Sequence, residues 1–558
     1  MGYLLHILGA LLAQGLAEFG WTTGWKIPWA VPVLVAVPHA LAWGSRRAFL
    51  AGWFRSSSAL LRGLSASAPI LQLVALCAFG WMDSTKEWLG TEISLDSWPR
   101  GEMLLALLPF VLYEIAAIDA RARIVAPSGR DRSAWRRFQV RMFLSALVPF
   151  VAYVLVTAAI GASRTLRVEI EEVALFGALF VGSMLLGLAL ALPTLLRNVW
   201  DTSPMPPGLQ RDVLTGVATQ AGFRARSLLS WNTGDLMANA AIVGIGPRTR
   251  IVLFSDSLLS QLDLPELAAV FAHEIGHAAR RHVLHFVVWA VGFFLLADVV
   301  ANRLLAGDDW LAGGFLIAAV VGWLLVFGYV SRRFELEADL FCLDLLGDAT
   351  ALIAALEKVG GHFRDVASWR HFSTADRVRF LADATADPQV GRRLRRTLRT
   401  WKRCGVLLLV VALSLQAWTL ARSFRDDRTR ADLRLGRYSA AVARVGDTDS
   451  PDPALRELAS KGASLSGDGA PVPEIEARAR QSLAKGDLES ARAWLELGAM
   501  RGEIELDRVA RAIRALAEGS ATPREVLEAP GLESWRTDFE AGLRRLPPNP
   551  APGGSRSP

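Results

Sequence analysis

The sequence predicts an α-helical membrane protein that crosses the bilayer several times, with a small α+β domain and a C-terminal α-helical module. Three observations support this fold class. Of the 558 residues, 52% are hydrophobic, and the mean hydropathy of +0.30 is too high for a soluble protein. The apolar residues gather in runs close to the length of about 20 residues that a membrane span needs. The chain turns polar between residues 206 and 264, and it turns charged and alanine-rich after residue 421.

Residues 1–200 are predicted to form the N-terminal transmembrane helices. The apolar runs lie near residues 3–19, 27–44, 66–82, 102–118, 141–162 and 173–196. His6, Gln14 and Glu18 interrupt the first run, which could instead be an uncleaved signal-like start or an interfacial helix. Arginine-rich loops alternate with an acidic loop at residues 83–96, and by the positive-inside rule the arginine-rich loops face the cytoplasm. Six spans then return the chain to the cytoplasmic side of the cell (inner) membrane before Arg197.

Residues 201–400 are predicted to form a domain that includes a hairpin of two further spans at residues 285–330. An amphipathic helix is expected at residues 209–221. Residues 239–246 and 250–254 are expected to form a short β-hairpin around Pro247-Arg248-Thr249. Residues 401–421 are predicted to be the final transmembrane helix.

A short motif in this domain points to metal chemistry. His273-Glu274-Ile275-Gly276-His277 lies in an apolar helical run. Because a helix brings residues four apart onto one face, His273 and His277 can bind a single ion while Glu274 lies within reach of a metal-bound water. This spacing is typical of zinc hydrolases. The alternative is a helix with two solvated or hydrogen-bonded histidines.

A catalytic zinc site needs a third protein ligand, and a second motif offers carboxylates for it. Glu335 and Asp339 are four residues apart on an expected helix that follows the two-span hairpin. One carboxylate can bind the metal, and the other can accept a hydrogen bond from the free ring N–H of a ligand histidine. The alternative is a charged start of a helix beside the membrane.

Together, residues 273–277, Ser331-Arg332-Arg333-Phe334-Glu335 and Ala338-Asp339 resemble the membrane-integral gluzincin zinc metallopeptidases. This family holds the CAAX prenyl endopeptidases and the HtpX-type proteases, and the resemblance runs from about residue 206 to 381. It implies a zincin-like α+β peptidase domain with one Zn²⁺ per chain. The resemblance also implies a role for each residue. His273, His277 and Glu335 would bind the metal, Glu274 would be the general base, and Asp339 would orient a ligand histidine.

Three further residues resemble less specific features of the family. His371 and Arg377 keep a family spacing of six residues and would stabilise an oxyanion, although Phe372 and Ser373 stand where prolines are common. A surface histidine and arginine are the alternative. Asn239 resembles the start of the edge strand that holds the substrate backbone, and a turn-capping asparagine is equally consistent with its position. His282 is expected at the membrane interface or behind a metal ligand.

The C-terminal part is predicted to be a soluble helical module at residues 422–546, with a disordered tail at residues 547–558. Residues 436–441 and 485–491 resemble the starts of tetratricopeptide-like helical hairpins, which often bind a protein partner. The three cysteines show no disulfide or metal spacing.

The predicted function is a membrane-embedded, zinc-dependent endopeptidase that cleaves membrane-associated or misfolded proteins on the cytoplasmic side. The expected partners are a peptide or protein substrate and membrane lipids, and nucleic acid is not expected because the basic residues lie between apolar runs. The alternatives are a CAAX-type processing peptidase and a non-proteolytic scaffold stabilised by metal. A transporter would need more charged residues within the spans than His6, Glu18 and His39 provide.

Overall fold

The computed structural model describes residues 2–18, 25–89, 102–125, 129–304, 309–361, 364–446, 452–518, 520–529 and 532–545. The chain divides into two compact units. The first holds residues 1–161 and 183–416, and the second holds residues 162–182 and 417–558. The predicted disordered tail at residues 547–558 lies outside the described residues.

Six helices of the described chain are long and apolar enough to cross a membrane. They are Met103–Val125, Asp131–Gly161, Ala174–Val199, Leu264–Ala301, Gly314–Leu346 and Pro388–Leu435. A seventh span is possible if Phe54–Ser65 and Ser67–Ala78, which meet at an angle of 59°, cross the membrane as one bent pair. The chain is therefore a multi-pass membrane protein, as its composition predicted.

The N-terminal spans differ from the prediction. Residues 27–44 are not a continuous span: Pro28 and Pro32 begin two short 3₁₀ helices. Proline lacks the backbone N–H that a helix interior needs, so each one starts a new turn. The elements of this region are α1 (Gly2–Glu18), η1 (Pro28–Ala30), η2 (Pro32–Val35), α2 (Ala36–Leu50), α3 (Phe54–Ser65), α4 (Ser67–Leu73), η3 (Val74–Ala78), α5 (Trp81–Leu89), α6 (Glu102–Ala106), α7 (Leu108–Val125), α8 (Gly129–Gly161), and α10 (Ala174–Val199). The predicted count of six spans before residue 200 is therefore wrong, and it cannot assign the next domain to a side of the membrane.

Polar side chains hold α1 within this helical region. Glu114 of α7 is fully buried, and its carboxylate lies 2.8 Å from Nδ1 of His6 and accepts a hydrogen bond from Arg121 at 3.0 Å. The hydroxyl of Tyr3 donates to Gln139 of α8 at 2.7 Å. His6, which interrupts the apolar run in the sequence, therefore has a buried partner.

A small four-stranded sheet follows α10. The strands β1 (Thr202–Pro204), β2 (Ser227–Trp231), β3 (Ala240–Val243) and β4 (Ile251–Ser255) stand in the order β1-β2-β4-β3. β2 and β4 are parallel, and the other two pairs are antiparallel. The hairpin of β3 and β4 and the helix α11 (Leu209–Gln220) confirm the expected elements. β3 is an edge strand.

β4 is buried on both faces of the sheet. Its five residues are all buried, with Val252 and Phe254 in one hydrophobic cluster and Ile251 and Leu253 in another. The ring of Phe254 meets Phe271 edge to face at 5.4 Å between centroids. Because Phe271 lies on the helix that carries the histidine motif, the sheet fixes the position of that helix.

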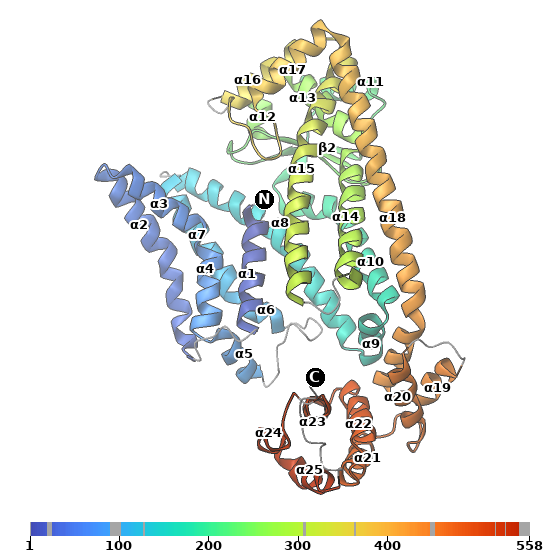
Figure 1. Cartoon of the computed structure of the whole chain (residues 1–558). Helices are drawn as coiled ribbons and strands as arrows, with labels where there is room; N and C mark the ends of the chain where they lie inside the picture. The colour runs from blue at the N-terminus through green and yellow to red at the C-terminus, as the bar shows by residue number, and fades with distance from the viewer. Residues whose placement is uncertain are drawn as a thin grey trace, which may run out of the picture. The chain divides into compact units, whose positions relative to one another are not determined.

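The histidine motif lies in α13 (Leu264–Ala279), which follows the short α12 (Asp256–Gln261). A capping box of Asp263 and Glu266, with Pro265 in the first turn, begins α13. The backbone turns at Arg281, where φ is +54°, and continues as α14 (His282–Leu304). α15 (Asp309–Leu346) then runs alongside α14 as one unbroken helix of 38 residues (Figure 1).

Glycines bring the backbones of these helices close together. A Cβ at Gly276 of α13 would lie 3.1 Å from Cα and from O of Ala338 in α15. A Cβ at Gly292 of α14 would lie 2.9 Å from N of Leu409 in α18 (Pro388–Leu435). Small residues permit such approaches between helices. The helices α16 (Thr350–Gly360) and α17 (Thr374–Ala386) stand between α15 and α18 in the sequence.

The second unit is helical, which confirms the predicted C-terminal helical module. It holds the end of α18 and the elements α9 (Arg164–Glu172), α19 (Tyr438–Val445), α20 (Pro453–Ala463), α21 (Val472–Ala484), α22 (Leu488–Met500), α23 (Ile504–Ala517), α24 (Pro523–Glu528), η5 (Glu533–Trp535) and α25 (Arg536–Leu543). Gly436 and Gly486 take positive φ between consecutive helices, at the points where the sequence resembles repeat starts. Arg434 of α18 contacts Glu171 and Glu172, which ties α9 to this unit.

We expect Gly276→Val to separate α13 from α15, because two additional methyl groups would meet backbone atoms that cannot rotate away. The substitution should destabilise the protein by about 1–3 kcal/mol. The measurement is the thermal unfolding midpoint of the purified protein in detergent. Gly216→Val in α11 is the control, because a Cβ there has no neighbour within 4 Å. Equal midpoints for both variants would show that the contact does not require glycine.

Candidate metal centre

Three side chains from α13 and α15 converge on one point. Nε2 of His273 lies 3.2 Å from Nε2 of His277. Oxygens of Glu335 lie 3.6 Å from Nε2 of His273 and 3.7 Å from Nε2 of His277. One ligand atom from each residue falls within 4.8 Å of the other two. The residues that the sequence singled out as metal ligands are therefore neighbours in space.

The spacing of these atoms fits a tetrahedral zinc ion. Zinc bonds to nitrogen and oxygen are about 2.0–2.2 Å long, which places neighbouring ligands of a tetrahedron about 3.3–3.6 Å apart. The distance between the two imidazole nitrogens, 3.2 Å, lies near this range, and each imidazole has one oxygen of Glu335 at 3.6 or 3.7 Å, Oε2 for His273 and Oε1 for His277. Two imidazoles and one carboxylate are also the donors of many catalytic zinc sites, which leave a fourth position for water or substrate. The site can thus hold one zinc ion.

A chain of contacts behind His273 fixes the direction of its ring. Nδ1–H of His273 donates to Oδ1 of Asp339 at 2.9 Å, which leaves Nε2 free for a metal. Asp339 is fully buried and accepts two further hydrogen bonds from Arg377, at 2.9 Å from Nε and 2.5 Å from Nη2. Burial opposes the charge of Arg377, but Asp339 and Glu335 outweigh it, so the pKa of the guanidinium lies above its ordinary value. Asp339 therefore lies behind His273, in the position that its predicted orienting role requires.

A second chain of contacts lies behind His277. Nδ1 of His282 is 2.9 Å from Nδ1 of His277, and Nε2 of His282 is 2.8 Å from the carboxylate of Glu337. Because a carboxylate only accepts, Nε2–H of His282 donates to Glu337, and Nδ1 of His282 accepts the proton of His277. Nε2 of His277 is then free for a metal. Lys402 of α18 completes the chain with a hydrogen bond of 2.7 Å to Glu337.

The sequence reasoning missed Glu337 and Lys402. The one local signal was the position of Glu337, two residues after Glu335 in the same motif. The ring of Phe334 stacks on His282 with centroids 4.2 Å apart and planes 4° apart, so His282 is 1% exposed. Of the two places expected for His282, the structure supports the one behind a metal ligand.

His371 and Glu274 border the same point. Nδ1 of His371 lies 3.3 Å from Oε1 of Glu335, and its side chain is 48% exposed. Glu274 follows His273 in α13 and is half-buried. Arg377 forms ion pairs with Asp339, which lies behind His273, and with Glu335 at 3.8 Å.

Asn239 stands at the start of the edge strand β3, and its backbone fixes that start. Its N–H donates to Oγ of Ser255 at 2.9 Å, and its carbonyl accepts from the N–H of Ser255 at 2.9 Å. In an antiparallel ladder the bonded pairs alternate. The backbone N–H and C=O groups of Ala240 and Ile242 therefore face away from β4, toward the open side of the edge.

Asp256 holds the loop before β3. It accepts hydrogen bonds from the hydroxyl of Thr233 at 2.5 Å and from the N–H groups of Gly234 and Asp235 at 2.8 and 3.1 Å. Burial opposes the charge of the carboxylate, but these donors outweigh it and hold the pKa of Asp256 below its usual range. The loop is thereby fixed where it enters the edge strand.

The fold and the site together define a class: a multi-pass membrane protein with an HExxH metal centre between a short helix and a long one. Residues 209–401 match the model of Peptidase family M48. This match confirms, for residues 209–401, the resemblance drawn from the motifs.

The similar proteins come from both branches of that resemblance. The chain is 29% identical over 177 residues to a CAAX prenyl protease 1 homolog of Oryza sativa subsp. japonica, covering 28% of this chain and 41% of that protein. It is 30% identical over 167 residues to a Protease HtpX homolog of Thermoanaerobacter pseudethanolicus, covering 26% of this chain and 52% of that protein. The chain thus spans about half or less of the length of these curated relatives. A solved structure, the crystal structure of S. mikatae Ste24p, is similar over 63% of this chain and 97% of that chain, with a TM-score of 0.38 and 14% identity.

We expect Glu337→Gln to weaken zinc binding, although Glu337 is not a ligand. The amide lacks the charge that holds His282, and His282 holds the ring of His277. Loss of such a partner typically costs 10–100-fold in metal affinity, and we expect a decrease of about that size. Chelator competition on the purified protein measures it.

Glu357→Gln is the matched control, because Glu357 pairs with Arg364 away from the metal ligands. The thermal unfolding midpoint of the metal-free protein shows whether each variant is folded. If Glu337→Gln is folded and binds zinc as tightly as the control, the contacts behind His277 do not support the metal.

Proposed function

We propose that this protein is a membrane-embedded, zinc-dependent endopeptidase. The observation that carries the proposal is the meeting of His273, His277 and Glu335, which each offer one ligand atom within 4.8 Å of the others, with Glu274 next to the first of them in α13. The match to Peptidase family M48 supports the same activity.

Each residue of the site has a separate role in the proposed peptide hydrolysis. Zinc bound to these ligands would supply a Lewis acid that activates water and polarises the peptide carbonyl. Glu274 accepts the proton of the attacking water and then delivers it to the leaving amine. His371, half-exposed beside Glu335, donates its ring N–H to the developing oxyanion. Arg377 supports this charge from behind, and it holds Asp339 against His273.

The edge of β3 is the proposed binding place for the substrate backbone. The outward N–H and C=O groups of Ala240 and Ile242 can pair with an extended peptide, which would become a fifth strand. β3 also contacts α13, the helix of the two histidines. Asn239 fixes the start of this strand through its backbone.

The active site is proposed to face the cytoplasm. Basic residues gather at the same end of three spans as the metal ligands: Arg280 and Arg281 follow α13, Arg332 and Arg333 precede Glu335, and the first turns of α18 hold a further cluster, Arg392, Arg393, Arg395, Arg396 and Arg399. By the positive-inside rule, such segments remain on the cytoplasmic side. This argument does not depend on the number of N-terminal spans.

The substrates are proposed to be membrane-associated or misfolded proteins. The similar proteins include both HtpX proteases and CAAX prenyl protease 1 homologs, so processing of prenylated CAAX peptides is the second candidate. Cleavage of an unfolded membrane-protein reporter, compared with a farnesylated and an unfarnesylated CAAX peptide, separates the two.

We expect Glu274→Gln to abolish cleavage and retain zinc, because the amide cannot accept a proton and is not a metal ligand. The rate of reporter cleavage should decrease by about 10²–10⁴-fold. Bound zinc is measured in the same preparation, and Glu357→Gln is the control for loss of a carboxylate. Equal cleavage by Glu274→Gln and wild type would instead favour a scaffold in which the metal is structural.

We expect Ile242→Pro to weaken substrate binding, since it removes one outward N–H of β3 while the inward ladder remains. One lost hydrogen bond of about 1 kcal/mol corresponds to a KM about fivefold higher, with zinc content unchanged. Ile242→Val, which keeps the N–H, is the control. An unchanged KM in Ile242→Pro would argue against strand addition at this edge.

A further inference from the structure

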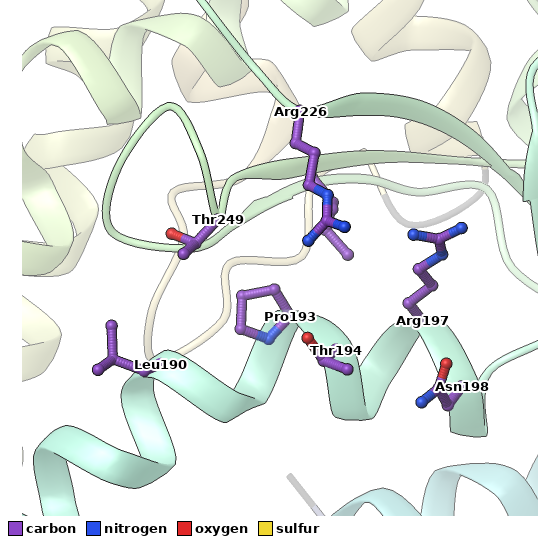
Figure 2. Close-up of a pocket in the computed structure, with 8 residues that line it drawn as sticks. Leu190, Pro193, Thr194, Arg197, Asn198, Arg226 and Thr249 are labelled. Carbon is purple, nitrogen blue, oxygen red and sulfur yellow. The ribbon is translucent and has the colours of Figure 1, made fainter.

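A cavity of about 190 Å³ lies where the last turns of α10 meet the peptidase sheet (Figure 2). Leu190 and Pro193 of α10 provide its apolar part. Thr194 and Asn198, one turn apart on the same helix, provide a hydroxyl and an amide. The cavity is separate from the metal ligands, none of which lines it.

Two arginines enter this cavity from different elements. Arg197 rises from the end of α10, and Arg226 extends toward Pro193 and Thr194 from the residue before β2 (Figure 2). The N–H of Arg226 donates to the carbonyl of Arg250 at 2.8 Å, which fixes its backbone beside β4. The same small cavity is thus lined by two guanidinium groups.

Neither guanidinium is neutralised within the part of the chain that the structure describes. No carboxylate forms an ion pair with Arg197 or Arg226, and both residues are exposed. The acidic residue that follows α10, Asp201, is paired with Arg141 at 2.8 Å. The cavity therefore has an uncompensated positive charge and suits an anion.

The surface of α10 below the cavity is apolar and uncovered. Leu185, Leu186, Leu188 and Leu190 are 40–60% exposed on this candidate membrane span. In a bilayer, acyl chains would cover these side chains. The cavity lies at the end of this candidate span, so in a bilayer that α10 crosses it would lie near the polar headgroups.

We propose that this cavity binds the headgroup phosphate of an anionic phospholipid, whose acyl chains lie along α10. The planar fork of arginine binds phosphate oxygens in pairs, and the hydroxyl of Thr194 and the amide of Asn198 supply further donors. The uncovered leucines favour a lipid over a free phosphate ion. The inference does not depend on the proposed peptidase activity, since it requires only that α10 lies in the membrane.

The test measures the lipid that remains bound to the full-length protein. The protein is purified from vesicles of equal parts phosphatidylglycerol and phosphatidylcholine, and native mass spectrometry gives the ratio of the two in the bound lipid. The wild type should be enriched in phosphatidylglycerol. The double variant Arg197→Gln/Arg226→Gln should lose that enrichment by about tenfold or more, since each basic residue near the surface contributes to the attraction.

The matched control is Arg224→Gln/Arg248→Gln. Both residues are exposed, neither lines the cavity, and the pair removes the same amount of charge. This control should keep the enrichment of the wild type. Arg197→Lys/Arg226→Lys, which keeps the charge but not the planar fork, should have an intermediate value.

Three results would overturn the inference. Equal losses in the two Gln pairs would mean that the general surface charge attracts the lipid. No loss in Arg197→Gln/Arg226→Gln, with an unfolding midpoint equal to that of the wild type, would mean that the cavity is not the site. Displacement of phosphatidylglycerol by excess inorganic phosphate would assign the cavity to a soluble anion.

Discussion

The close crossing of α13 and α15 is the contact on which the metal centre depends. Gly276 leaves no side chain between the two helices, so the backbone at Ala338 approaches to van der Waals distance. The same crossing brings the carboxylate oxygens of Glu335 to 3.6–3.7 Å from the two imidazoles. The sheet and the capping box of α13 serve the same end, because they fix the direction in which that helix meets its partner.

Behind the ligands, each histidine is held by a chain that ends on a cation. The chain behind His273 passes through Asp339 to Arg377, and the chain behind His277 passes through His282 and Glu337 to Lys402. Each buried carboxylate is thus paired with a positive group, which offsets the high cost of burying a lone charge. Both chains also leave Nε2 as the free atom of the imidazole. The tautomers that the metal needs are set before it binds.

The sequence could single out the proposed ligands because their spacing is local. Residues four apart on a helix share a face whatever the rest of the fold does, so His273 with His277 and Glu335 with Asp339 could be paired in advance. That the two motifs meet in space was inferred from the need of a zinc site for a third ligand and from the resemblance, because spacing along the sequence does not show it. The contacts of Glu337 with His282 and Lys402 depend on the crossing of three helices, and the position of Glu337 beside Glu335 was the only local signal for them. The cavity between α10 and the sheet was missed for the same reason.

The errors in the N-terminal region have a different cause. Hydropathy averaged over residues 27–44 hides Pro28 and Pro32, each of which begins a short 3₁₀ helix where the average is still high. The packing of α9 against the end of α18 could not be predicted either, because Arg434 and Glu171 are far apart in the sequence.

The length of α15 has a mechanical consequence. At 1.5 Å per residue, Glu335 lies about 30 Å from Gly314 along one unbroken helix. If α15 tilted by about 5° around Gly314, Glu335 would move by about 2–3 Å. A change in bilayer thickness that tilts α15 would therefore move Glu335 relative to the two histidines of α13.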